Sequence, residues 1–129
     1  MSRTEDRKNA FKLLFSDSFG VEVSNFSSEF TKELFFGVKK NQELIDNLIK
    51  SNIRNWKFNR ISRVAKCTMR LSIYEMLKSD VPIAVAVNES VEIAKIFGSE
   101  EEANYVQAVL SAVSLSYNDY LTSNDLKLI

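Results

Sequence analysis

The chain has 129 residues, of which 45% are hydrophobic and 26% are charged, a composition typical of one soluble domain with a single core. Its 17 basic and 17 acidic residues give a formal net charge of zero, which excludes a protein that coats nucleic acid by bulk charge and leaves room only for a local basic face. The absence of histidine and the presence of one cysteine, Cys67, exclude an intrachain disulfide and a thiolate cluster, and they predict a protein that is not an enzyme and holds no metal or cofactor.

Turn-forming residues are scarce, with three Gly and one Pro in the whole chain. This scarcity favours long helices with short connections, so we predict an all-α bundle of about seven helices in two layers. No apolar run approaches the ~20 residues of a membrane span, and the polar opening does not fit a secretory signal. We therefore expect a cytoplasmic protein.

The first helix is predicted to begin after Ser2, which forms a capping box with Glu5, and to run to about Ser18. Gly20 is expected to end it. Its apolar stripe consists of Ala10, Phe11, Leu13, Leu14 and Phe15.

Two further helices follow a Ser-rich connection over residues 21–28. The stripe of the second is Phe30, Leu34, Phe35 and Val38, and that of the third is Leu44, Ile45, Leu48 and Ile49. Asn41 is expected to cap the third helix. The phenylalanines of this three-helix layer share faces with the leucines, which favours a role in the core.

Basic residues recur at helical spacing without an intervening carboxylate between Asp46 and Glu75, which predicts an electropositive side. These residues are Lys50, Arg54, Lys57, Arg60, Arg63, Lys66 and Arg70. Trp56 and Phe58 lie among them and either stack on bases or close the junction between the two layers. The dense apolar residues from 61 to 77 predict a central helix that its neighbours surround.

Asp80-Val81-Pro82 is predicted to break this helix and to start the next, which runs to about Phe97. Ser99 to Glu102 form a second capping box, and the last helix is expected to bury Ala103, Val106, Leu110 and Val113. Residues 1–117 are predicted to form a single domain, and residues 118–129 a flexible tail.

Several segments in this order resemble the NusB family of bacterial transcription factors. They are RLSIYEML from Arg70, DVP from Asp80, VNESVEIAK from Val87, FG at residues 97–98 and, more weakly, YVQAVL from Tyr105. The resemblance implies a NusB-like helical bundle. It also implies an antitermination factor that, with NusE, a small-subunit ribosomal protein, binds boxA-type leader RNA and joins RNA polymerase to suppress termination in ribosomal RNA operons, as a monomer or a homodimer.

Two other functions are compatible with parts of this pattern. The zero net charge permits a helical module that binds only protein. The RNA-binding domain of an rRNA cytosine methyltransferase is the other alternative, and it is disfavoured because the chain contains no nucleotide-binding βαβ unit.

The resemblance also implies two sets of site residues. The RNA-binding set is Arg3, Arg7, Lys8, Lys12 and Phe15, and the NusE-binding set is Arg70, Tyr74 and Glu75. The chain departs from the family pattern in both RNA elements, where Thr4, Glu5 and Asp6 follow Arg3 and where Gln107, Ala108 and Ser111 replace Asn, Gly and Asp. These changes predict weak RNA binding by the protein alone, strengthened by NusE.

Overall fold

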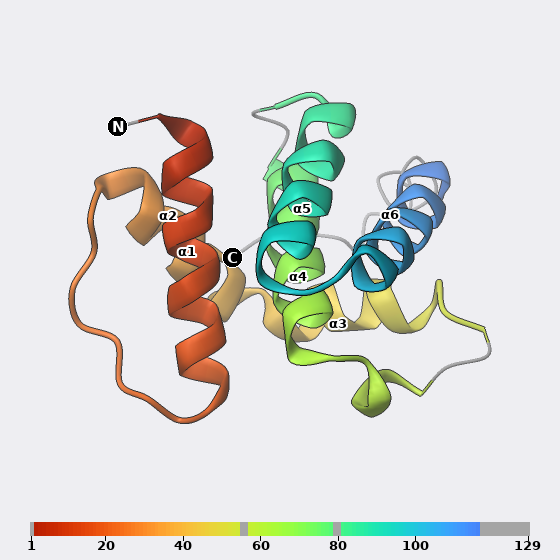
Figure 1. Ribbon diagram of the computed structural model, residues 1–129, viewed down its shortest axis with the longest axis horizontal. Coiled ribbons are helices and arrows are strands. Elements are labelled where there is room, and N and C mark those ends of the chain that lie inside the picture. Colours follow the sequence, from red (N-terminus) through yellow and green to blue (C-terminus); the bar gives the residue numbers. More distant parts are fainter. Residues whose placement is uncertain (1, 55–56, 79–80, 117–129) are drawn as a thin grey trace.

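The computed structural model describes residues 2–54, 57–78 and 81–116 (Figure 1). Those residues form six α-helices and one short 3₁₀ helix, with no strand among them. The elements are α1 (Arg3–Ser18), α2 (Glu29–Lys40), α3 (Gln42–Lys50), η1 (Phe58–Arg60), α4 (Arg63–Lys78), α5 (Ile83–Phe97) and α6 (Glu100–Leu115). The predicted all-helical class is confirmed.

Serine side chains cap three of the helices as the local sequence requires. Ser2, Ser28 and Ser99 each accept a hydrogen bond from the backbone N–H three residues later, at 3.1, 3.0 and 3.1 Å. Gly20 has a φ of +84°, a left-handed conformation that favours glycine and ends the chain's first helical segment. The predicted caps at Ser2 and Ser99 are thus confirmed.

Asn41 caps a different helix from the one predicted. Its side chain makes no capping bond to α3, and its Nδ2 donates instead to the carbonyl of Gly37 at 2.7 Å. The reason is the backbone of Asn41, which has φ −111° and ψ 14° because α2 passes almost directly into α3. This side chain therefore satisfies a carbonyl at the end of α2.

Helix α4 is the centre of the fold, as its apolar density predicted. It packs against α1, α2, α3, α5 and α6. In Figure 1, α1 and α2 lie to the left of it, α6 lies to the right, α5 lies in front of it and α3 lies near its lower end. Ten residues of α4 are buried, including Met69, Leu71, Ile73 and Met76. Burial on all sides of one helix is what joins the two layers around a single core.

The basic residues from Lys50 to Arg70 are divided among three elements of the structure and their connections. Lys50 ends α3, residues 58–60 form η1, and α4 begins at Arg63. Pro82 lies just outside α5 as its N-cap residue, with φ −59°. The predictions for Trp56, for Asp80 and for the tail from residue 118 lie outside the described residues.

Gly37 provides the space in which the ring of Tyr74 packs between α2 and α4. A Cβ at position 37 would lie 2.2 Å from Cζ of Tyr74 and 2.5 Å from its Cε1. Gly→Ala in a helix interior ordinarily stabilises by about 1 kcal/mol, but this contact forces the ring or the helix to move. We expect Gly37→Ala to lower the free energy of unfolding by about 1–3 kcal/mol, measured by urea denaturation.

The control is the same change in a Tyr74→Leu background, where the clashing ring atoms are absent. In that background Gly37→Ala should lower the free energy of unfolding by much less. The difference between the two losses is the coupling free energy between positions 37 and 74, and it should be large. Equal costs in the two backgrounds would contradict the steric explanation.

Within the described ranges, none of the helices has the length and hydrophobicity that crossing a bilayer requires.

Candidate nucleic-acid interface

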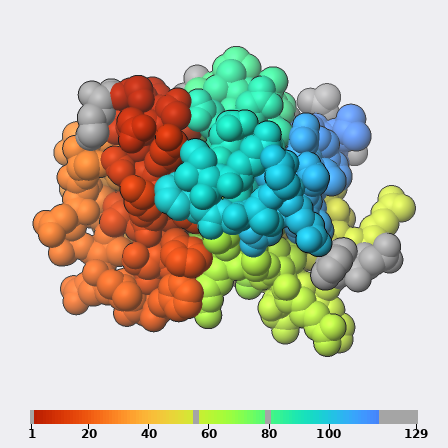
Figure 2. All heavy atoms as spheres, in the orientation of Figure 1, coloured from red at the N-terminus to blue at the C-terminus, as the bar shows by residue number. Residues whose placement is uncertain are grey.

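One face of α1 presents two cationic and two aromatic side chains in a row. The row, which we call the α1 face, consists of Lys8, Lys12, Phe15 and Phe19. Their spacings of four, three and four residues place them on the same side of a helix. In Figure 2, α1 is open to solvent along its length on the face shown, and the end of α5 lies beside it. Of this row, Lys12 and Phe19 are exposed, whereas Lys8 and Phe15 are half-buried.

The two rings of the α1 face, Phe15 and Phe19, meet edge to face and continue a row of aromatic contacts. Phe15 lies 5.8 Å from Phe11 and 5.1 Å from Phe19 between ring centroids, and Phe11 stacks on Phe97 at 5.0 Å. Phe11 is buried, but Phe19 is 58% exposed. Phe19 lies one residue beyond the predicted end of the first helix, where the three-helix layer ends.

The basic part of the α1 face is only lightly neutralised. Lys12 is exposed, has its Nζ 5.7 Å from the ring centroid of Phe97, and has no carboxylate within 4.0 Å in the described part of the chain. Lys8 Nζ lies 3.6 Å from Glu5, an exposed i,i+3 pair of the kind that contributes little. Cations beside exposed rings are the arrangement that binds single-stranded nucleic acid, with phosphates on the cations and bases on the rings.

Arg3, also predicted to bind RNA, points away from this row. It lies five residues before Lys8, which places it on another side of α1. Its guanidinium carbon is 3.8 Å from the ring centroid of Phe30, at the start of α2. The structure therefore brings together Lys8, Lys12 and Phe15 of the predicted set and separates Arg3 from them.

Arg7 is buried in an ion-pair network that joins three helices. Its Nε and Nη2 donate to the two carboxylate oxygens of Glu75 at 2.7 and 2.9 Å, and its Nη1 lies 3.3 Å from Glu89. The side chains of Arg7 and Glu75 are 5% and 6% exposed. Thr4 Oγ1 also donates to Glu89, at 3.0 Å.

Burial alone would lower the pKa of Arg7, but the hydrogen bond to Glu75 and the charges of Glu75 and Glu89 outweigh it, so the pKa lies above its ordinary value. The guanidinium therefore stays charged and remains bound to Glu75 and Glu89. Its RNA role stays a prediction, and the geometry favours a role in fixing α1 against α4 and α5.

The two acidic residues at the start of α1 also have local functions. Asp6 is 4% exposed, accepts from Ser28 Oγ at 2.9 Å, and its backbone carbonyl accepts from Thr31 Oγ1 at 3.1 Å. These contacts join α1 to α2. Asp6 therefore does not add a negative charge to the α1 face, and only the exposed Glu5 does.

The three residues predicted to bind a protein partner do not form an exposed patch. Glu75 is bound to Arg7, and Tyr74 is 6% exposed between α2 and α4. Arg70 donates from Nε and Nη2 to the carboxylate of Asp46 at 2.8 and 3.0 Å, and both side chains are 14% exposed. Their partner-binding roles stay a prediction, and the geometry places all three in helix packing.

Phe58 packs against the core, which agrees with the interpretation that it closes the junction between the two layers. Three cationic side chains also surround its ring. The Nζ atoms of Lys50 and Lys66 each lie 5.0 Å from its ring centroid, and Arg70 Cζ lies 5.8 Å away. Three basic residues from α3 and α4 thus meet on one ring, although they do not share a helix.

No cluster of three possible metal ligands occurs in the part of the chain that the structure describes. Cys67 is buried within α4, and burial raises the pKa of its thiol despite the opposing charges of Arg70, Lys66 and Arg63. Its surroundings are those of a packed side chain.

Comparison with known proteins agrees with this architecture. The NusB family model matches residues 4–115. The transcription antitermination protein NusB of Bacillus licheniformis is 42% identical over 128 residues, covering 88% of this chain and 96% of the relative.

Two solved structures also match. A NusB structure from T. maritima superposes with a TM-score of 0.77 at 28% identity, covering 89% of this chain and 92% of that one. A chain from a crystal structure of antitermination factors NusB and NusE in complex with dsRNA superposes with a TM-score of 0.75 at 25% identity. The match covers 91% of this chain and 100% of that one. With a family match over most of its length and a curated relative of this similarity, the chain belongs to the NusB family of transcription antitermination factors, which are not enzymes.

Proposed function

We propose that this protein binds boxA-type leader RNA together with NusE, the small-subunit ribosomal protein, and that the complex joins RNA polymerase to suppress termination in ribosomal RNA operons. The observation that carries the RNA part is the α1 face, where Lys8 and Lys12 lie in one row with Phe15 and Phe19. The NusE part is supported by the match to the chain from the NusB, NusE and dsRNA complex.

The geometry favours modest affinity for RNA by the protein alone. Of the four basic residues predicted at the amino end, Arg7 is buried and Arg3 points toward Phe30, so two cations remain on the α1 face. Each phosphate contact contributes about 0.7 to the slope of log affinity against log salt for a single strand, so two contacts give a shallow dependence. A second protein that extends the basic surface would raise both the affinity for RNA and the steepness of its salt dependence.

The test is a titration of a labelled boxA-type RNA with the protein, with and without NusE, at about 50 and 200 mM salt. We expect weak, salt-sensitive binding by the protein alone and tighter binding with NusE. A protein that binds NusE but adds nothing to the RNA affinity of NusE would contradict the proposal and favour the alternative of a module that binds only protein.

A further inference from the structure

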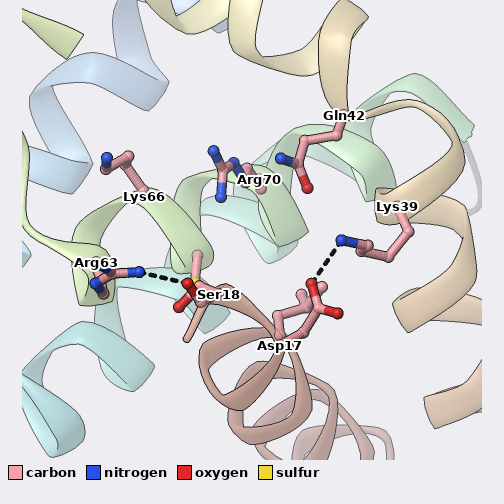
Figure 3. A pocket seen from close by; sticks show the side chains of 9 residues that line it. Asp17, Ser18, Lys39, Gln42, Arg63, Lys66 and Arg70 are labelled. Carbon is pink, nitrogen blue, oxygen red and sulfur yellow. Dashed lines mark hydrogen bonds and ion pairs between the residues drawn. The ribbon is translucent and has the colours of Figure 1, made fainter. Parts of the chain in front are cut away.

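A basic cavity lies at the carboxyl end of α1, where α1 meets the α2–α3 junction and the first turns of α4 (Figure 3). We call it the basic pocket. Its volume is about 260 Å³. Four cationic side chains line it, together with the single carboxylate of Asp17: Lys39, Arg63, Lys66 and Arg70.

Three of these cations are held in place by their own partners. Lys39 pairs with Asp17, and Arg70 pairs with Asp46. Arg63 Nη1 donates to the backbone carbonyl of Ser18 at 2.6 Å, an interaction drawn in Figure 3. Because these side chains are fixed before any ligand arrives, they lose little conformational entropy on binding one.

Lys66 forms no ion pair in the described part of the chain, and its Nζ lies 5.0 Å from the ring centroid of Phe58. The structure shows no Asp or Glu oxygen within 4.0 Å of its Nζ in the described ranges. Burial lowers the pKa of Lys66, and the nearby charges of Arg70 and Arg63 lower it further, against a smaller opposing effect of Asp46. A bound anion would remove this repulsion.

We propose that the basic pocket binds a phosphate group of the RNA backbone, held by Arg63 and Lys66, as a second RNA contact beyond the α1 face. This inference rests on the proposed RNA-binding function. The contact in the basic pocket would lengthen the path of the same RNA strand beyond the end of α1.

The position of Phe19 favours RNA over a carboxylate of a protein partner. Phe19 is 58% exposed, ends the α1 face, and has Arg63 Cζ 4.2 Å from its ring centroid. An exposed ring next to a cation-lined cavity suits a nucleotide, whose base stacks while its phosphate is held. From Lys8 to Phe19 the helix rises by roughly 16 Å, a length of about five stacked nucleotides.

The basic pocket therefore joins two surfaces that the sequence presents as competitors, the amino-terminal basic residues and the basic residues of the central helix. Phe15 and Phe19 lie between them, 5.1 Å apart. A single strand that follows the α1 face reaches Arg63 without leaving the protein surface.

The test compares Lys66→Gln with Lys50→Gln in the full-length protein. Both changes remove one charge, and both lysines lie 5.0 Å from the ring of Phe58, but only Lys66 lines the pocket. With labelled boxA-type RNA and NusE, Lys66→Gln should lower the salt slope by about 0.7 and the affinity at about 50 mM salt roughly tenfold. Lys50→Gln should leave the salt slope unchanged and the RNA affinity within twofold of the wild type. Lys66→Arg keeps the charge and should retain the wild-type salt slope.

Inorganic phosphate is the second probe, followed by backbone amide shifts of residues 63–70 at constant ionic strength. We expect saturable shifts in the wild type that Lys66→Gln removes. If phosphate binds but RNA affinity is unchanged in Lys66→Gln, the pocket serves a small anion or a partner carboxylate, and the RNA assignment is overturned. If wild-type protein with NusE binds no RNA at all, the proposed function fails and this inference with it, whereas unchanged RNA and phosphate binding in Lys66→Gln refutes only the inference.

Discussion

Glu75→Ala is expected to lower the free energy of unfolding by about 3–5 kcal/mol, because it leaves the buried guanidinium of Arg7 without its bidentate partner. Both side chains are about 95% buried, and they join α1 to the central helix α4. Glu89 remains 3.3 Å from Arg7, but its side chain is 22% exposed and it offers one contact in place of two. Urea denaturation followed by circular dichroism measures the loss.

The control replaces both partners, as Arg7→Met with Glu75→Leu. Removing the whole ion pair and filling its space with apolar atoms is often close to neutral, so the double variant should be clearly more stable than Glu75→Ala. A loss below about 1 kcal/mol in Glu75→Ala would show that the network contributes little to holding α1 in place.

The helices could be predicted from the sequence because their signals are local. Ser2 and Ser99 are followed three residues later by glutamates, and apolar residues recur at helical spacing on every predicted helix. The central position of α4 also followed from its sequence, because the apolar residues from 61 to 77 are too dense to lie on one face of a helix.

The site was predicted only in part, because pairings between distant residues leave no local signal. Arg7 and Glu75 are 68 residues apart, so the family resemblance implied an RNA surface for one and a partner surface for the other, whereas they form one buried pair. For the same reason Asp6 was counted among the changes that weaken RNA binding, although it accepts a hydrogen bond from Ser28. A basic residue within an amphipathic helix does not itself show whether it faces solvent.

Phe19 was missed although a signal was present. It follows Phe15 by four residues and Phe11 by eight, so it continues one face of α1. The predicted helix ended at about Ser18, so Phe19 was left out of its apolar stripe. In the structure it has φ −96° and ψ 6°, close enough to helical for its ring to continue the row.

The central claim is that RNA binds along the α1 face rather than at the tip of α1 near Arg3. Two double variants separate these surfaces: Lys8→Glu with Lys12→Glu on the α1 face, and Arg3→Glu with Lys32→Glu at the tip and on the adjoining exposed part of α2. Each contains two charge reversals, so the change in net charge is the same. Thermal unfolding of both variants is the control that checks whether each remains folded.

The decisive measurement is the affinity of each variant for labelled boxA-type RNA in the presence of NusE at about 50 mM salt. Loss of two phosphate contacts predicts a decrease of roughly a hundredfold for Lys8→Glu with Lys12→Glu, together with a shallower salt dependence. The variant with Arg3→Glu and Lys32→Glu should stay within a fewfold of the wild type. The reverse order, with the larger loss in the Arg3 and Lys32 variant, would contradict the account and place the RNA at the tip of α1.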